Sequence, residues 1–454
     1  MVIVSQILFF IVFFTTIYIL YRRIKLISNN IRMGRHIALN DHINERWKNV
    51  LLIAFGQKKM FRRPLPAIFH LLIYTGFIII NLEVLEFIID GMTGHHRVFA
   101  VLMQRSSPDL AEYSTIYNVL MNFFELLTIG VIVACIIFLV RRNVLKLKRF
   151  SGIEMTRWPL LDANLILIFE IILMLAILTM NAADQVLQAG RISGYTSTGT
   201  LFFSNMFMVP VLQNLKTNQL VFTERAAWWF HILGIFGFAI YVTYSKHLHI
   251  ILAFPNTYYA SLNTPGTISN MEEVMEEVKI MLGLESQGEH VPADIPRLGV
   301  KDVTDLTWKN LLDAYTCTEC GRCTSVCPAN ITGKKLSPRK IIMDVRDRME
   351  TLGRLKNTDD GKSLFDYISK EEIFACTTCN ACSDICPVSI DPVSVIIGMR
   401  RYSVMEESSS PAAWNMMFNN IETNFAPWKF PTADRFRWVE ELQKTNATHD
   451  KSDK

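Results

Sequence analysis

The chain has 454 residues, of which 50% are hydrophobic and only 19% are charged. It is too apolar for a typical soluble enzyme and too charged toward its C-terminus to lie in a membrane throughout, so two unlike parts are expected. The formal net charge of +4 is small for this length and excludes the basic footprint of a nucleic-acid-binding protein.

The first half of the chain contains five apolar stretches long enough to cross a bilayer, which takes roughly 20 helical residues. We predict spans at Ile3–Tyr21, Leu65–Ile89, Ile116–Val140, Leu160–Met180 and Ala226–Phe254. No basic residue precedes the first stretch, and Arg22 and Arg23 follow it directly, so we predict a retained span rather than a signal peptide.

Basic residues are concentrated in the loop between the first two spans and in the loop between the third and fourth, whereas the alternate loops carry few. The positive-inside rule then places the N-terminus outside and everything after Phe254 in the cytoplasm. The sequence therefore predicts a multi-pass protein of the cell (inner or cytoplasmic) membrane, whose C-terminal part lies in a reducing compartment suited to metal-binding cysteines.

Histidines are rare inside membrane spans and indicate a function there. If the fifth span is one continuous helix, His231 and His249 lie about five turns, or roughly 27 Å, apart on one face. His70 in the second span is expected at the depth of His249, so these two would ligate one heme iron from opposite sides. His247 would point about 160° away from the His231 face, so only one of His247 and His249 can serve that heme.

His231 has no evident histidine partner, because span two offers at that depth only Glu83, Glu86 and Asp90, and His95 and His96 follow in a loop. Either one or two hemes are therefore expected, and polar packing between helices is the alternative for each histidine. No C-x-x-C-H motif occurs, so the heme would be non-covalent b type.

Three further polar or reactive residues lie within predicted spans. Glu125 and Glu170 either carry protons toward a quinone or, as is more common, act as buried hydrogen-bond partners. Cys135 is expected to pack as a small apolar residue.

Eight of the nine cysteines fall in two short runs, CTECGRCTSVCPAN from Cys317 and CTTCNACSDICPVS from Cys376. Each is C-x2-C-x2-C-x3-C-P, the run of two-cluster bacterial ferredoxins, in which the fourth cysteine ligates the other cluster. The predicted ligands are Cys317, Cys320, Cys323 and Cys386 for cluster 1, and Cys376, Cys379, Cys382 and Cys327 for cluster 2. Disulfides and zinc are the alternatives that this doubled spacing disfavours.

The two runs are separated by a stretch, Pro338–Leu355, with the apolar spacing of a helix, which favours an α-helical ferredoxin domain. We predict an all-α chain: a five-helix transmembrane domain over 1–254, an amphipathic linker over 255–299 that is polar at 287–296, and a ferredoxin domain with two [4Fe-4S] clusters over 300–405. The last segment, 406–454, is apolar from Trp414 to Leu442 and should pack on the ferredoxin domain or a partner, with a disordered end from Lys444.

These features together resemble the membrane-bound iron–sulfur oxidoreductases related to heterodisulfide reductase, including the electron-transfer-flavoprotein:menaquinone oxidoreductases. The resemblance rests on His70 after the RRP turn, His231, the SKHLH run at Ser245–His249, both cysteine runs and the NIETNFAPW stretch. It implies a nitrate-reductase gamma-like cytochrome b domain joined to an α-helical ferredoxin domain, and electron exchange with menaquinone. The family usually adds a cysteine-rich CCG domain, but no cysteine follows Cys386, so we expect that centre, or a flavoprotein, on a separate cytoplasmic subunit.

The leading hypothesis is therefore the electron-transfer subunit of a quinone-linked oxidoreductase rather than a complete enzyme, because no acid–base pair or nucleophile indicates other chemistry. The alternative from another class is an iron–sulfur redox sensor or structural membrane protein without heme. A fumarate- or succinate-type iron–sulfur subunit would need further cysteines for a [2Fe-2S] domain, and a transporter would need repeated, Gly/Pro-broken helices.

Overall fold

The structure, a computed structural model, describes residues 2–105, 115–150, 152–264, 266–284, 297–356 and 358–452. Within these residues the chain is helical and contains no β-strand, apart from a parallel bridge between Arg35 and Thr307. The chain divides into two compact units: residues 1–269 with 302–395, and residues 270–301 with 396–454. The first unit contains the membrane helices and both cysteine runs, and the predicted all-α class is confirmed.

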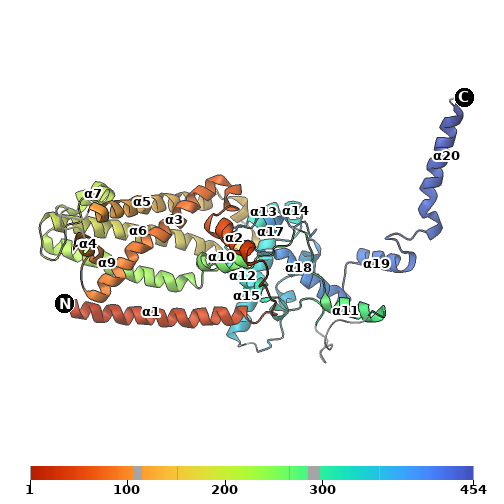
Figure 1. Cartoon of the computed structure of the whole chain (residues 1–454), viewed down its shortest axis with the longest axis horizontal. Helices are drawn as coiled ribbons and strands as arrows, with labels where there is room; N and C mark the ends of the chain where they lie inside the picture. Colours follow the sequence, from red (N-terminus) through yellow and green to blue (C-terminus); the bar gives the residue numbers. More distant parts are fainter. Residues whose placement is uncertain are drawn as a thin grey trace. The chain divides into compact units, whose positions relative to one another are not determined.

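Five helices of the first unit are long and apolar enough to cross a membrane, as predicted (Figure 1). They are α1 (Val2–Ile31), α3 (Pro64–Thr93), α5 (Thr115–Asn143), α6 (Trp158–Ala189) and α9 (Thr217–Val242). The first four extend beyond the predicted spans, because a helix continues through the polar residues that flank its apolar core. Shorter helices between them are α2 (Ile43–Asn49), α4 (Val98–Arg105), α7 (Phe202–Phe207) and α8 (Val209–Leu212).

Helices α3, α5, α6 and α9 pack in sequence against one another, and α1 lies along α9 and α3. One core cluster contains Ile80, Val131 and Ile177, and another joins Phe9 of α1 to Phe236 of α9. Many apolar side chains on the outside of the bundle are exposed, Ile3, Val4, Ile11 and Phe14 of α1 among them. In a membrane these side chains would contact lipid.

The fifth span is shorter than predicted. Helix α9 ends at Val242, a 3-10 turn covers Lys246–Leu248, and a new helix, α10 (His249–Tyr258), follows. The Ser245 hydroxyl accepts a hydrogen bond from the His247 N–H, and the Asp162 carboxylate of α6 accepts one from the Lys246 N–H at 3.2 Å. Because these side chains satisfy backbone donors at the break, the helix need not continue. The prediction of one continuous helix carrying His231 and His249 on one face is therefore wrong.

The cysteine-bearing part of the first unit packs against the end of the membrane bundle where α10 begins, through contacts of α12 with α1 and α10 and of α15 with α1. Its helices are α12 (Trp308–Thr316), α13 (Arg322–Val326), α14 (Pro328–Ile331), α15 (Pro338–Arg354), α16 (Lys370–Phe374), α17 (Ala381–Ile385) and α18 (Pro392–Arg401), the last of which continues into the second unit. Ser337 caps α15 and Pro338 occupies its first turn. The predicted apolar face of α15 is buried: Ile341, Ile342, Val345 and Met349.

The second unit contains α11 (Glu272–Met281), α19 (Ala412–Asn424) and α20 (Arg437–Ser452). Helix α11 lies within the predicted amphipathic linker, whose polar residues 287–296 lie outside the described residues. Helix α19 has no buried side chain, and Phe425, Trp428 and Phe430 after it are exposed. Its packing on the ferredoxin domain or a partner stays a prediction. Helix α20 runs through the residues from Lys444 that the sequence predicts to be disordered.

Candidate redox centres

The two cysteine runs adopt matching backbone conformations. In each run the residue two positions after the first cysteine has a positive φ, 54° at both Glu319 and Thr378, and so does the residue before the short helix, 69° at Gly321 and 57° at Asn380. The third cysteine of each run then lies in the short helix, α13 or α17, and these two helices pack side by side. The fourth cysteine ends that helix.

Backbone N–H groups point at the sulfur atoms within these loops. The Glu319 N–H donates to Cys317 Sγ at 3.5 Å, the Thr378 N–H to Cys376 Sγ at 3.3 Å, and the Ile390 N–H to Cys386 Sγ at 3.4 Å. Such donors stabilise negative charge on sulfur, which is the state in which cysteine ligates a metal. The loops are thus suited to hold thiolates.

Thiols from different runs lie close enough to interact electrostatically. Burial raises the pKa of the Cys323 thiol well above its usual value, and the neighbouring thiols Cys320, Cys317, Cys386 and Cys382 raise it further. Burial likewise raises the pKa of Cys386 to about 12, and the charged group that adds most to this effect is Cys320 of the other run. Thiols with pKa values this high lose their protons only when a metal cation binds to the sulfur atoms. Cys386 therefore lies near Cys320 and Cys323 of the opposite run.

No disulfide joins any of the nine cysteines, all of which are described. Within the described part of the chain, no group of three or more His, Cys, Asp or Glu side chains is gathered tightly enough to hold a single metal ion.

A cavity of about 320 Å³ connects the membrane helices with the first cysteine run. On the membrane side it is lined by Phe77, Cys135, Phe138, Ile166 and Glu170. At its other end it reaches Thr318, Glu319, Cys320, Pro387 and Val388. The cavity therefore lies between the interior of the bundle and the cysteines predicted for cluster 1.

Three of the four predicted heme histidines line this cavity: His70 of α3, His247 and His249. The rings of His70 and His249 have centroids 6.4 Å apart. Two imidazoles that share one metal from opposite sides, with metal–nitrogen bonds of about 2 Å, have centroids about 6 Å apart. The pair therefore has the spacing that axial ligation of one iron requires.

Each of these two histidines is also oriented by an oxygen at its other nitrogen. His70 Nδ1 lies 3.1 Å from Gln57 Oε1, and His249 Nδ1 lies 3.0 Å from the Lys246 carbonyl oxygen. With the N–H of Nδ1 donated to that oxygen, Nε2 is left as the lone-pair donor, which is the usual arrangement of a metal-ligating histidine.

His247 does not point away from this site, contrary to the helical-wheel prediction, because the segment is a 3-10 turn rather than part of α9. Its ring packs edge-on against His249 at 5.5 Å and against Phe238 at 5.9 Å. It lines the cavity beside His249.

His231 lies elsewhere in the bundle. It is 1% exposed, its Nδ1 lies 3.1 Å from the Leu173 carbonyl oxygen, and its Nε2 has no hydrogen-bond partner. Its ring packs edge-on against Phe87 of α3 at 5.6 Å, and no histidine ring is paired with it in the part of the chain that the structure describes. His96, which the sequence offered as a weak candidate, instead contacts Asp184 and Glu224.

Cationic side chains that sequence reasoning did not single out line one wall of the cavity: Arg141, Arg142, Arg149, Lys246 and Arg322. Arg142 Nε and both Nε and Nη1 of Arg149 are buried without a hydrogen-bond partner. Burial, the largest influence on it, lowers the pKa of Arg149 to about 10. Buried guanidinium nitrogens need acceptors, so this wall is suited to a ligand that carries carboxylates, such as a heme with its propionates.

The two span carboxylates differ in their surroundings. Glu125 Oε2 accepts the N–H groups of Phe203 and Ser204 at 2.9 and 3.1 Å, so it caps the start of α7. Glu170 lines the cavity together with Cys135, which is fully buried. Glu125 therefore stabilises the fold through its hydrogen bonds to α7, whereas Glu170 faces the cavity.

Ion pairs attach the cysteine-bearing part to the membrane helices. Arg23 of α1 pairs with Glu350 of α15 at 2.8 Å, and Arg339 pairs with Glu154 at 2.7 Å. Glu319, between the first two cysteines, is shared by Lys246 at 2.5 Å and Arg346 at 2.7 Å. These largely buried contacts hold the first cysteine run at the mouth of the cavity.

The fold and these centres define the class: a membrane protein that carries an iron–sulfur domain for electron transfer. The family model of the 4Fe-4S dicluster domain matches residues 316–390, which contain both cysteine runs. No solved structure matches the chain.

Curated relatives agree with this class. The chain is 26% identical to the probable iron-sulfur-binding oxidoreductase FadF of Bacillus subtilis, over 97% of this chain and 61% of that one. It is 25% identical to the EtfAB:quinone oxidoreductase of Syntrophomonas wolfei, over 89% of this chain and 55% of that one. A shorter match, 31% over 22% of this chain and 52% of the relative, is to one of the subunits of the ferredoxin:CoB-CoM heterodisulfide reductase of Methanosarcina mazei.

These matches confirm the resemblance to the heterodisulfide-reductase-related iron–sulfur oxidoreductases. The chain spans less than two thirds of the length of its two long relatives, 61% and 55%.

Proposed function

We propose that the chain is the electron-transfer subunit of a respiratory oxidoreductase complex in the cell membrane. It passes electrons between a cytoplasmic donor or catalytic subunit and menaquinone, through two [4Fe-4S] clusters and b heme. The observation that carries this proposal is the cavity that has the His70–His249 pair in its wall and reaches Cys320 at its end.

The cysteines would hold the clusters with exchanged fourth ligands. We assign Cys317, Cys320, Cys323 and Cys386 to cluster 1, and Cys376, Cys379, Cys382 and Cys327 to cluster 2. The proximity of Cys386 to Cys320 supports the exchange. Cys379 of cluster 2 is exposed, whereas no cysteine assigned to cluster 1 is exposed, so cluster 2 offers the more accessible edge to a soluble partner.

His70 and His249 would hold one b heme, which would supply a one-electron carrier. Gln57 and the Lys246 carbonyl orient the two imidazoles, the apolar wall excludes water, and the guanidinium groups of Arg142 and Arg149 receive the carboxylates. His231 is not part of this site. A second heme would need a partner for it that the described residues do not provide.

The partners follow from the same reasoning. The charge of the loops supports an N-terminus outside the cell and a ferredoxin domain in the cytoplasm. A relative is named as a quinone oxidoreductase acting with EtfAB, which supports a quinone as acceptor and a cytoplasmic flavoprotein or CCG-type iron–sulfur subunit as partner. The lipid bilayer is the third partner.

Anaerobic reoxidation tests this function. The purified full chain in detergent is reduced with dithionite, freed of excess reductant and mixed with a soluble menaquinone analogue, while heme absorbance and cluster EPR signals are followed. We expect all centres to reoxidise together. Clusters that are present without heme and do not respond to the quinone would contradict the proposal and favour the iron–sulfur sensor.

A further inference from the structure

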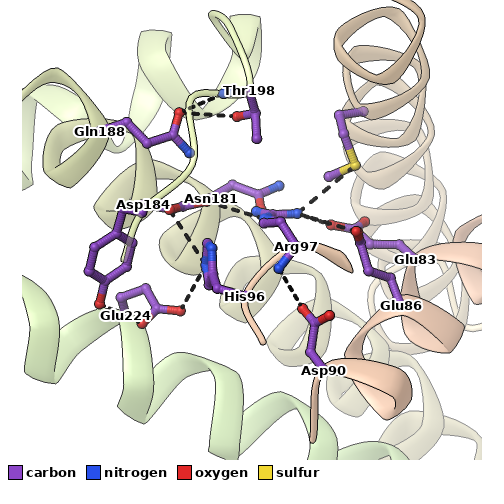
Figure 2. Close-up of polar contacts among 12 residues, drawn as sticks. Glu83, Glu86, Asp90, His96, Arg97, Asn181, Asp184, Gln188, Thr198 and Glu224 are labelled. Carbon is purple, nitrogen blue, oxygen red and sulfur yellow. Dashed lines mark hydrogen bonds and ion pairs between the residues drawn. The ribbon is translucent and has the colours of Figure 1, made fainter. Parts of the chain in front are cut away.

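A buried polar cluster, drawn in Figure 2, surrounds the start of α4, which lies at the end of the membrane bundle remote from α13 and α17 of the cysteine runs (Figure 1). Its centre is Arg97, which is 2% exposed and precedes α4. The Arg97 side chain donates to Asp184 Oδ2 at 3.2 Å and to Asn181 Oδ1 at 2.6 Å, both on α6. Neither Glu83 nor Arg97, Asn181 or Asp184 is among the residues that line the cavity, so this cluster is a separate site from it.

Most carboxyl groups of the cluster have donors that stabilise their charge. Asp90 accepts the backbone N–H groups of Arg97 and Val98 at 2.9 and 3.1 Å. Glu86 accepts the Phe99 N–H at 2.9 Å and the Tyr117 hydroxyl at 2.8 Å. Glu224 is bound by Arg225 and the Tyr195 hydroxyl. Each of these carboxyl groups therefore has hydrogen-bond donors for its oxygens.

Glu83 is different. It is 1% exposed, and neither of its oxygens has a hydrogen-bond partner. Its polar neighbours are Arg97, whose Nη1 lies 3.7 Å from Oε1, and the Asn181 amide, and neither makes a hydrogen bond of normal geometry with it. Figure 2 shows the carboxyl group pointing from α3 toward Arg97. An ionised carboxylate without donors in such a place is very costly.

The charges around Glu83 also disfavour another anion. The groups that face the cluster are Glu86 and Asp90 of α3, His96 and Arg97 before α4, Tyr117 and Glu125 of α5, Asp184 of α6, Tyr195, and Glu224 and Arg225 of α9. Burial, and then Arg97, lower the pKa of His96 to about 3, so its imidazole is neutral. Among the described residues that face the cluster, the carboxyl groups therefore outnumber the two cations, Arg97 and Arg225.

We propose that Glu83 is a proton-binding site that holds a proton in the resting protein. Glu83 is then a neutral acid at the inner end of the polar cluster. The cluster opens toward the membrane surface at His96. The His96 side chain is 15% exposed, and its Nε2 lies 3.6 Å from Asp184 Oδ1 and 3.8 Å from Glu224 Oε1. Asp184 in turn binds Arg97, which borders Glu83. The proton exchanges with water on this face of the membrane, and the site exists whether or not the electron-transfer role is correct.

Infrared difference spectroscopy of the purified full chain tests this site. We expect the Glu83→Gln variant to lose a C=O stretching band of a protonated carboxyl group that shifts in D2O. The matched control is Glu86→Gln, one helical turn away, which removes a hydrogen-bonded carboxylate and should leave that band in place. An identical protonated-carboxyl region in wild type and Glu83→Gln would overturn the proposal.

A stability measurement gives a second, independent readout. Because Gln mimics a neutral acid, Glu83→Gln should leave the melting temperature unchanged, whereas Asp184→Asn, which removes the ionised partner of Arg97, should lower it. If Glu83→Gln lowers the melting temperature as much as Asp184→Asn does, Glu83 is an ionised partner of Arg97 and the proposal is wrong. Neither measurement depends on heme or quinone, so the proposed function can fail without affecting the result.

Discussion

The ring centroids of His70 and His249 are 6.4 Å apart, although the helices that carry them, α3 and α10, are separated in the sequence by most of the membrane domain. The break after Val242 makes this possible, since it turns the chain so that α10 begins with His249 at the cavity. His247, two residues earlier, packs against the ring of His249 instead of pairing with His70.

This arrangement predicts different effects for the two neighbouring histidines. His247→Ala should retain heme, with a shifted midpoint potential, because it removes a ring that only supports His249. His249→Ala should lose it, because it removes a ligand. A redox titration followed at the heme absorbance measures both, and heme loss in His247→Ala alone would reverse the assignment.

The exchange of cysteine ligands predicts which variants share a phenotype. Cys386→Ser should weaken the same EPR signal as Cys320→Ser and leave the signal that Cys379→Ser removes, because Cys386 lies beside Cys320. Cys135→Ser, which changes a cysteine outside both runs, serves as the control and should keep both signals. If Cys386→Ser and Cys379→Ser instead weaken the same EPR signal, each run ligates its own cluster.

The cationic cavity wall predicts a change in heme potential. Replacing Arg149 by Gln removes a positive charge that stabilises the reduced heme, so the midpoint potential should fall by tens of millivolts, about 59 mV for each tenfold change in a one-electron equilibrium. Arg354→Gln is a suitable control, because the Arg354 side chain is 73% exposed and is not among the residues that line the cavity. An equal shift in both variants would argue against a specific role for Arg149.

The ion pair between Arg23 and Glu350 predicts a stability effect at the attachment of the ferredoxin part. Glu350→Gln leaves a largely buried guanidinium group with a weaker acceptor, which should cost about 2 kcal/mol of unfolding free energy. Glu371→Gln breaks an exposed pair with Lys335 and should have a much smaller effect on the unfolding free energy. Denaturant titrations of the two variants, followed by tryptophan fluorescence, compare them directly.

The same contacts should weaken in acid. Although burial opposes ionisation, the hydrogen bonds from Arg23 and Tyr315 hold the pKa of Glu350 below its usual value of 4.5, and the pKa of Glu154 is lowered at its contact with Ser337 and Arg339. Because these pKa values are lower in the folded protein than in the unfolded chain, the two carboxylates contribute their full stabilisation above pH 4.5. This contribution is lost as the pH falls through their folded-state pKa values. Below pH 4.5, the denaturant concentration at the unfolding midpoint should decrease more steeply for the wild type than for a Glu154→Gln, Glu350→Gln double variant. Parallel pH profiles would contradict this origin.

Local patterns in the sequence predicted much of the architecture. The five apolar stretches, the cysteine spacing and the apolar face of α15 each depend on neighbouring residues, so the membrane helices and the iron–sulfur domain could be predicted. The pairing of His70 with His249 was also expected, but from a continuous helix that the structure does not have.

What the sequence could not predict depends on contacts between distant residues. The end of α9 at Val242 is stabilised in part by Asp162 of another helix, and no glycine or proline marks it. Arg149, in the 3-10 turn Lys148–Phe150, and Gln57, 13 residues before His70, line the same cavity as the histidines, and no local pattern shows this. Arg97 looked like an ordinary loop residue, although it is the centre of a buried polar cluster.

The central claim is that this cavity binds b heme between His70 and His249. The most direct measurement is the dithionite-reduced minus oxidised absorbance spectrum, with a pyridine hemochrome assay of heme per chain, for the wild type, His70→Ala, His249→Ala and the exposed-site control His36→Ala. We predict one b heme per chain in the wild type and in His36→Ala, and none in the other two variants. A wild-type protein without heme, or full heme content in His70→Ala and His249→Ala, would contradict the account.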